Sequence, residues 1–232
     1  MKQKVQEKIL SLVKDNYNSI ARDFNQTRKK PLWPALTYAA SKVNNGEIIL
    51  DAACGNGRLL EAFKDKKIDY LGLDNSSELI MLAKNNYPDK EFLVDDLLAL
   101  DFAKNKNFDW IFCVAALHHL PGDNLRIKAL KNLALKLKSQ GRLVLTVWRP
   151  GKNKKFSQAL RSSFWKKFFF ISRLDFGDVI FNWDGQIKNQ ESRPRYYHAF
   201  RKNEFKNLIF RAGLRITEFI EDEHNFLVII QK

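Results

Sequence analysis

Two acidic residues and a pair of glycines form the most informative pattern in this sequence. Asp51 ends the apolar segment Ile48-Ile49-Leu50, and Gly55 and Gly57 follow shortly after it. A strand that ends in a glycine-rich turn lets the backbone approach a ligand closely. Asp74 ends the next apolar segment, where a carboxylate can hold the two hydroxyls of a ribose. This spacing predicts a site for an adenosine-containing cofactor.

The residues of the turn favour S-adenosylmethionine (SAM) over a nicotinamide dinucleotide. The dinucleotide fingerprint needs a third glycine where Leu60 stands. The carboxylate of Asp51 would repel a pyrophosphate, but it suits the ammonium and sulfonium groups of SAM. We therefore expect SAM at this site. The alternative is an ordinary turn beside an incidental acidic residue.

The elements that must position these residues alternate between strands and helices. This alternation predicts an α/β fold, with a parallel sheet that helices cover on both faces. The expected strands are 48–50, 70–73, 92–94, 110–115 and 142–148, and the helices between them are 58–65, 75–85 and 124–137. After a helix at 202–211, strands 214–220 and 226–230 are joined by a link too short for a parallel crossover. These two strands should therefore form an antiparallel hairpin.

Two segments lie outside this alternation, within a chain expected to form a single domain over 1–232. Residues 1–45 predict a helical extension, because apolar residues recur at helical spacing over 3–22 and a second helix is expected at 35–44. Residues 149–190 form a basic, aromatic insertion after the fifth strand.

The net charge of +14 is distributed unevenly. Residues 51–100 carry a net charge of −4, so the remainder carries +18. The segment from Arg149 to Arg173 holds eight basic residues, no acidic residue and several aromatic ones. Cations beside aromatic rings favour single-stranded nucleic acid, with phosphate contacts expected from Lys154, Lys155, Lys166 and Lys167. The alternative is an amphipathic helix whose aromatic residues pack inward.

Other classes of protein are disfavoured. Cys54 and Cys113 are too few to form a zinc site, and the sequence predicts no metal ligands. The longest uncharged apolar run is far shorter than a membrane span requires, and the N-terminus lacks a secretory signal. We expect a cytoplasmic protein that does not insert into a membrane.

These motifs together resemble the class I SAM-dependent methyltransferases. The resemblance rests on Leu50-Asp51-x-x-Cys54-Gly55-x-Gly57, Leu73-Asp74, Asp95-Asp96 and Leu117-His118-His119-Leu120. It implies a Rossmann-like sheet of seven strands, mostly parallel, with a C-terminal antiparallel hairpin. It also implies that Asp74 holds the ribose, that Asp96 or Asp95 holds the adenine amino group, and that main chain around Ala53 to Gly57 and Cys113 to Ala115 lines the cofactor. Ala53 and Gln140 depart from the family, which usually has glycine at both positions.

Three further blocks resemble the tRNA methyltransferases that esterify 5-carboxymethyluridine at the wobble position. The blocks are Tyr17-Asn18-x-Ile20-Ala21-x-x-Phe24-x-x-Thr27-Arg28 with Trp33-Pro34, then Val147-Trp148, then Arg195-Tyr196-Tyr197-His198-x-Phe200 with Glu204-Phe205. The resemblance implies tRNA as the substrate. It also implies a small zinc-binding activator protein as a partner.

A carboxylate acceptor would already be ionised, so the enzyme needs groups that position it and no general base. Arg28, Arg195 and His198 are the candidate catalytic residues for that work, because Arg can clamp an anion through two hydrogen bonds. Tyr196 or Tyr197 is expected to contact the uracil. Two alternatives remain open: a small-molecule O- or N-methyltransferase of the same fold, and a SAM- or tRNA-binding module without activity.

Overall fold

The computed structural model describes residues 1–28, 31–101, 107–149, 154–168, 172–183 and 193–232. The side chains of residues 154–156, 166–168, 183 and 193 also lie outside this description.

The centre of the molecule is a seven-stranded sheet with the order β3-β2-β1-β4-β5-β9-β8. The chain begins it in the middle with β1 (Ile48–Ala52), then adds β2 (Asp69–Asp74) and β3 (Glu91–Val94) on one side. It returns to add β4 (Phe108–Val114) and β5 (Leu137–Trp148) on the other side. All five strands are parallel, and this reversal of direction beside β1 leaves a crevice at the carboxyl ends of β1 and β4.

The C-terminal hairpin closes one edge of the sheet as predicted. Strand β9 (Asn225–Gln231) pairs antiparallel with β5, and β8 (Arg215–Glu221) pairs antiparallel with β9. The expected sheet of seven strands with an antiparallel C-terminal hairpin is therefore confirmed.

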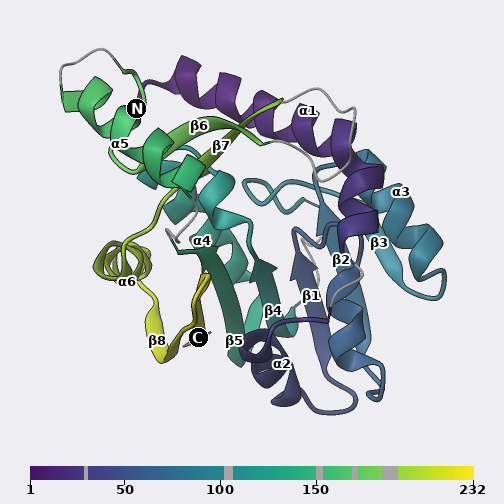
Figure 1. The fold of residues 1–232 in the computed structure, drawn as a ribbon. Helices are drawn as coiled ribbons and strands as arrows, with labels where there is room; N and C mark the ends of the chain where they lie inside the picture. Colours follow the sequence, from purple (N-terminus) through teal and green to yellow (C-terminus); the bar gives the residue numbers. More distant parts are fainter. Residues whose placement is uncertain (29–30, 102–106, 150–153, 169–171, 184–192) are drawn as a thin grey trace.

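Helices cover both faces of the sheet (Figure 1). They are α1 (Gln3–Thr27), α2 (Pro34–Ser41), α3 (Ser77–Asn86), α4 (Asp123–Leu135), α5 (Lys154–Phe168) and α6 (Lys202–Arg211). The helix expected at 58–65 is instead a short 3₁₀ helix, η1 (Arg58–Phe63), and a second one, η2 (Leu117–His119), follows β4. Helix α1 is longer than expected: it continues past residue 22 to Thr27, which brings its last turns over the glycine-rich turn.

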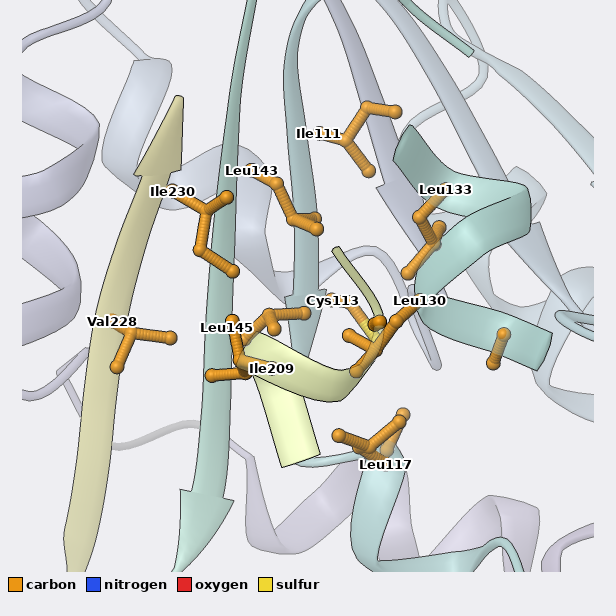
Figure 2. Close-up of a cluster of buried hydrophobic side chains, with 14 of the residues drawn as sticks. Ile111, Cys113, Leu117, Leu130, Leu133, Leu143, Leu145, Ile209, Val228 and Ile230 are labelled. Carbon is orange, nitrogen blue, oxygen red and sulfur yellow. The ribbon is translucent and has the colours of Figure 1, made fainter. Parts of the chain in front are cut away.

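One layer of the hydrophobic core lies between the sheet and helices α4 and α6 (Figure 2). Leu130 and Leu133 of α4 and Ile209 of α6 pack there against apolar side chains of β5 and β9. The near-continuous apolar runs of these strands suit a sheet that is buried on both faces.

A second, two-stranded sheet was not predicted. Strand β6 (Asp178–Trp183) pairs antiparallel with β7 (Arg193–His198), and α5 precedes them in the chain. Helix α1 packs against both β7 and α3, so it runs along the top of the molecule in Figure 1 beside the small sheet. The insertion after β5 thus supplies one strand of a structured unit and packs next to the N-terminal extension.

Candidate active site

Two adjoining cavities lie at the carboxyl ends of the parallel strands. We call the larger one, of about 470 Å³, the outer cavity, and the smaller one, of about 140 Å³, the inner cavity. The residues that line both are Phe24, Arg28, Ala53, Gly55, Val114, Ala115 and Trp148. The two cavities are therefore neighbouring parts of one site, built from the ends of β1, β4 and β5 and roofed by α1.

The turn after β1 forms the wall between the cavities. Gly55 has φ of +58°, and a Cβ atom there would lie 3.3 Å from the ring of Phe24 in α1. Gly57 (φ +80°) lines neither cavity; a Cβ atom there would lie 2.9 Å from the ring of Tyr87. The lack of a side chain at Gly55 therefore lets Phe24 of α1 pack close to the turn. The lack of one at Gly57 lets Tyr87 pack against the turn's other side. Ala53 also adopts a left-handed conformation (φ +70°), which costs a residue other than glycine about 1 kcal/mol.

Asp51 lies in the outer cavity and Asp74 in the inner one. The Tyr70 hydroxyl donates to Asp51 at 2.8 Å, and burial raises the pKa of Asp51 to about 7. Asp74 accepts hydrogen bonds from the backbone N–H groups of Gly55 and Ser76, both at 2.9 Å. Burial also raises the pKa of Asp74. Two buried carboxylates with few donors around them form a site that favours a ligand carrying cationic and hydroxyl groups.

Asp95 and Asp96 line the far end of the inner cavity beside Leu97. The Asp96 side chain accepts from the backbone N–H of Leu98, and the Asp95 side chain accepts from the backbone N–H of Asp96, each at 2.8 Å. These bonds hold both carboxylates at the strand end, where they can accept from an amino group. Together with Asp51 and Asp74, these acceptors fit SAM, whose ammonium, ribose hydroxyls and adenine amino group can all donate hydrogen bonds.

The side chain of Cys113 lies in the core rather than in this site, and a contact between its main chain and the cofactor stays a prediction. Cys113 lines neither cavity, and its side chain is fully buried among the core residues around Leu130 and Leu145 (Figure 2). Burial raises the pKa of its thiol to about 12. Its neighbours Val114 and Ala115 line both cavities, so the chain passes through the core just before it reaches the site.

The roof of the site carries Tyr17 and Arg28 from the α1 region. The guanidinium of Arg28 lies 4.5 Å from the centre of the Phe24 ring, and Arg28 lines both cavities. The Tyr17 hydroxyl lies 2.8 Å from Nε2 of His119, and Nδ1 of His119 lies 3.1 Å from the carbonyl oxygen of Tyr196. A carbonyl only accepts, so Nδ1 donates to it and Nε2 accepts from Tyr17. Burial lowers the pKa of His119 to about 4, which keeps the ring neutral.

Trp148 and Tyr197 stack with ring centres 4.8 Å apart, and Trp148 lines both cavities. Burial raises the pKa of Tyr197, and the nearby Arg195 opposes that effect by its charge and a hydrogen bond. Burial also raises the pKa of the Tyr17 hydroxyl, and the charge of Arg28 opposes this rise for both Tyr197 and Tyr17. Arg28 and Arg195, two of the three predicted catalytic residues, therefore approach the same pair of tyrosines, although Arg195 lines neither cavity.

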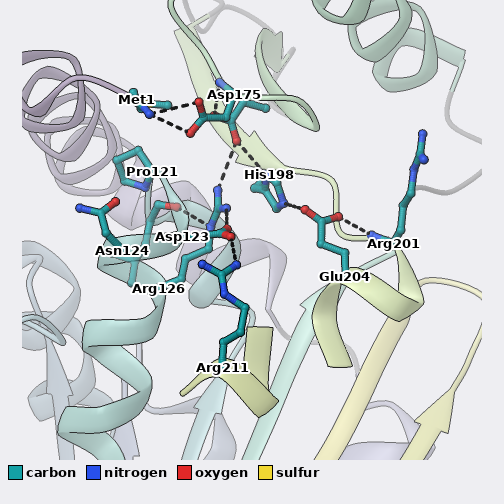
Figure 3. Close-up of polar contacts among 12 residues, drawn as sticks. Met1, Pro121, Asp123, Asn124, Arg126, Asp175, His198, Arg201, Glu204 and Arg211 are labelled. Atoms are coloured by element: carbon teal, nitrogen blue, oxygen red, sulfur yellow. Dashed lines mark hydrogen bonds and ion pairs between the residues drawn. The ribbon is translucent and has the colours of Figure 1, made fainter. Parts of the chain in front are cut away.

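His198 lies outside both cavities, in a polar network that Figure 3 shows. Tyr196 belongs to the same network, and for both residues the structure corrects the prediction. Nδ1 of His198 lies 2.7 Å from Asp178, and Nε2 lies 2.8 Å from Glu204. The Tyr196 hydroxyl donates to Asp178 at 2.7 Å and accepts from Arg126 at 3.1 Å. Both side chains are almost completely buried in this network, which lines neither cavity. They hold strand β7 in place and are not free to contact a uracil or a methyl acceptor.

The remaining predicted residues are lysines of α5. The side chains of Lys154, Lys155, Lys166 and Lys167 lie outside the described part of the chain, so their RNA contacts stay a prediction.

Several residues of the site had no assigned role in the sequence-based prediction. Arg58 and Arg149 join Arg28 in lining the outer cavity, and Trp33 lies there too. Trp33, Phe24 and Trp148 belong to the blocks that carried the family resemblance, which was the available signal for them. Arg58 directly follows Gly57 in the sequence. This position next to the glycine-rich turn is the feature from which a positive charge in the outer cavity could have been predicted.

No group of three or more His, Cys, Asp or Glu residues in the described part of the chain has the geometry of a metal site. Among the same residues, no helix combines the length and the apolarity needed to cross a bilayer.

Comparisons with known proteins agree with this geometry. A family model for a methyltransferase domain matches residues 49–141. A tRNA (carboxymethyluridine(34)-5-O)-methyltransferase of Schizosaccharomyces pombe is 26% identical over 93% of this chain and 94% of its own length. The enzyme of the same name from Saccharomyces cerevisiae is 35% identical over 61% of this chain. This second match spans half of the relative's length.

Solved structures share the fold at low sequence identity. A SAM-dependent methyltransferase of Methanosarcina mazei superposes with a TM-score of 0.70 at 21% identity, covering 88% of this chain and 99% of the other. A magnesium protoporphyrin IX methyltransferase of Synechocystis with bound SAH gives 0.63 at 15% identity, covering 96% and 98%. A chain from the complex of the Haloferax volcanii Trm112 methyltransferase activator with its methyltransferase gives 0.62 at 20% identity, covering 94% and 96%.

Proposed function

We propose that this chain, which carries a methyltransferase domain and the fold of SAM-dependent methyltransferases, methylates a carboxymethyl group on the wobble uridine of a tRNA. The two yeast relatives are named for this reaction. The names of these relatives support a carboxymethyl group as the acceptor. The charges of the two cavities support an acceptor that is an anion.

The observation that carries the proposal is the contrast between the adjoining cavities. Among the described residues, the inner cavity is lined by three carboxylates, those of Asp74, Asp95 and Asp96, and by one arginine, Arg28. Among the same residues, the outer cavity is lined by three arginines, Arg28, Arg58 and Arg149, and by one carboxylate, that of Asp51. Acidic groups suit a cationic cofactor, and arginines suit an anionic acceptor. Both cavities are lined by Ala53, Gly55 and Ala115, so the two cavities adjoin there and reactants bound in them can meet.

SAM, when bound, supplies a methyl group on a positively charged sulfur. The acceptor carboxylate oxygen forms the new bond to the methyl carbon as the carbon–sulfur bond breaks, and no proton has to move. The task of the protein is alignment, which lowers the barrier by holding the two partners in line. In this proposal Arg28 binds one carboxylate oxygen while the other attacks, and the ring of Trp148, which stacks on Tyr197, forms an apolar wall of the cavity beside it.

The test is transfer of a labelled methyl group from SAM to tRNA that bears or lacks 5-carboxymethyluridine. We expect label only on the carboxymethylated tRNA, in an ester that mild base hydrolyses. Arg28→Gln should lower kcat/KM by roughly ten- to a hundredfold, since removing one charge-assisted contact costs about 1.5–3 kcal/mol. Arg215→Gln, which removes an exposed charge from strand β8, is the matched control.

Two results would contradict the proposal. Methylation of a small carboxylic acid but of neither tRNA would indicate a small-molecule enzyme. Binding of SAM and tRNA without turnover would indicate a binding module.

We also propose a small zinc-binding activator of the Trm112 type as a partner, as in the Haloferax volcanii complex. Co-expression with such an activator should raise the specific activity of the chain. Equal turnover by the chain alone would show that it needs no activator.

A further inference from the structure

A third cavity, of about 530 Å³, lies beside the outer cavity, and we call it the side cavity. The two share Arg28, Leu32, Asn56 and Arg58. A ligand that occupies both therefore has to pass the two arginines. Neither the cofactor expected in the inner cavity nor the acceptor group expected in the outer cavity would fill this space.

The side cavity is positively charged at its boundary with the outer one. Arg28 and Arg58 both line the two cavities at this boundary, and burial, followed by the charge of Arg28, lowers the pKa of Arg58. Arg58 donates from Nη2 to the carbonyl oxygen of Pro31 at 2.8 Å, which fixes the direction of its guanidinium. Among the described residues of the lining, Glu61 is the one carboxylate, and it accepts from the Tyr87 hydroxyl at 2.7 Å.

Three asparagines line the same cavity in a fixed arrangement. The carbonyl oxygen of the Asn25 side chain accepts from Nδ2 of Asn56 at 2.8 Å and from Nδ2 of Asn86 at 3.0 Å. Nδ2 of Asn86 also lies 3.2 Å from the backbone oxygen of Asn56. These bonds set the orientation of the Asn25 amide, whose Nδ2 donates to no other described residue. A half-buried amide donor next to two guanidinium groups suits an oxygen-rich anion.

We propose that the side cavity binds the phosphodiester next to the nucleotide whose base enters the outer cavity, with Arg58 and Arg28 as its cationic contacts. This inference rests on the proposed function, because it takes RNA as the substrate. Guanidinium groups bind phosphate oxygens through paired hydrogen bonds. One RNA chain would occupy both cavities, with a base in the outer cavity and the adjacent phosphate in the side cavity. This explains why the two cavities share the arginines.

The test measures binding, so it does not depend on methyl transfer. The probe is an anticodon stem-loop RNA, and a set of variants each carries one uncharged methylphosphonate at a single loop linkage. Arg58→Gln should weaken binding of the unmodified RNA by roughly ten- to a hundredfold and reduce the slope of log K against log salt by about 0.7. One methylphosphonate should weaken binding to the wild-type protein and have little further effect on Arg58→Gln, which locates the linkage.

The controls distinguish the loss of a contact with RNA from the loss of the folded structure. Arg215→Gln removes the same charge from an exposed position outside all three cavities and should change the affinity less than about twofold. Arg58→Lys, which keeps the charge, should restore part of the affinity and most of the salt slope. Calorimetric binding of SAM to each variant confirms that the fold is intact.

Three outcomes would overturn the inference. The first is unchanged RNA affinity in Arg58→Gln. The second is a loss that is equal for every methylphosphonate position. The third is that inorganic phosphate competes as well as the RNA does, which would indicate a general anion site. Failure of the proposed function would look different: RNA would bind in an Arg58-dependent way, yet no carboxymethyl group would be methylated.

Discussion

Asp51, at the end of β1, is a buried carboxylate in the wall of the outer cavity. It is buried with the Tyr70 hydroxyl as its donor, and burial raises its pKa to about 7. The unfolded chain releases this proton near pH 3.9, so the folded state holds more protons between about pH 4 and pH 7. The stability of the free protein must therefore decline as the pH rises through that window.

A cationic ligand reverses this effect, which leads to a prediction. SAM should bind more tightly as the pH rises from about 6 to 8, because Asp51 gains its charge in that range, with a change of up to tenfold per pH unit below its pKa. Asp51→Asn should remove most of the pH dependence and weaken SAM binding. It should also raise the Tm of the free protein at about pH 8, by about 2–4 °C for each kcal/mol gained. Titration calorimetry and thermal unfolding across this pH range measure both effects, and a flat wild-type profile would contradict the prediction.

Strand β7 presents two faces with different tasks. Side chains alternate along a strand, so Arg195 and Tyr197 face one way and Tyr196 and His198 face the other. The first pair lies by the roof of the site, and the second joins a buried network with Asp178 of β6. Burial opposes ionisation of Asp178, but its hydrogen bond with His198 and the charge of Arg126 outweigh burial and lower its pKa.

Asp178 should therefore anchor the small sheet. Asp178→Asn should reduce the free energy of unfolding by about 3 kcal/mol, since it removes a charge that compensates the buried Arg126. Asp175→Asn, in a half-exposed ion pair nearby, should cost less than about 1 kcal/mol. Urea denaturation compares the two variants. The Asp178 contribution is present above about pH 4 and is lost as the pH falls through its lowered pKa, so Asp178→Asn should flatten the acid limb of the stability curve.

The same strand marks the limit of prediction from sequence. The strands of the main sheet and the acidic strand ends were predictable because each carries a local apolar run or a recognisable turn. Strand β6 was missed, and with it Asp178, the partner that explains His198. Alternation along β7 was the unused signal: it separates Arg195 and Tyr197 from Tyr196 and His198 without any structure. Arg58 was missed because the fold of the turn, rather than its composition, brings it beside Arg28.

At the scale of the whole molecule, charge divides the protein into two parts. The segment 51–100 has a net charge of −4 and supplies Asp74, Asp95 and Asp96 to the inner cavity and Asp51 to the outer one. The remaining +18 includes helix α5. The electric field of this positive charge attracts a polyanion such as RNA, and it makes the affinity for RNA depend on the salt concentration.

Replacing Lys154, Lys155, Lys166 and Lys167 by glutamine should weaken tRNA binding and reduce the slope of log K against log salt by up to about 3, since each phosphate contact contributes about 0.7–0.9. The same change at four exposed lysines elsewhere, Lys64, Lys67, Lys128 and Lys131, should leave the slope nearly unchanged. Filter binding at several salt concentrations distinguishes the two sets. Equal slopes would show that α5 makes no phosphate contacts.

The roof of the site has a consequence for how such an enzyme diversifies. Tyr17, Phe24 and Arg28 come before the matched methyltransferase domain at 49–141, and Trp148, Arg149 and Arg195 come after it. The carboxylates of the inner cavity are thus encoded in one continuous block, whereas the outer cavity combines Arg58 of that block with residues encoded on either side of it. In the flanking segments, Trp33 and Arg149 line the outer cavity and not the inner one, so substitutions there can alter the acceptor side while the lining of the inner cavity stays the same. A fragment cut at the boundaries of the matched domain would keep the acidic strand ends and Arg58, but it would lose Arg28 and Trp148 from the walls of both cavities.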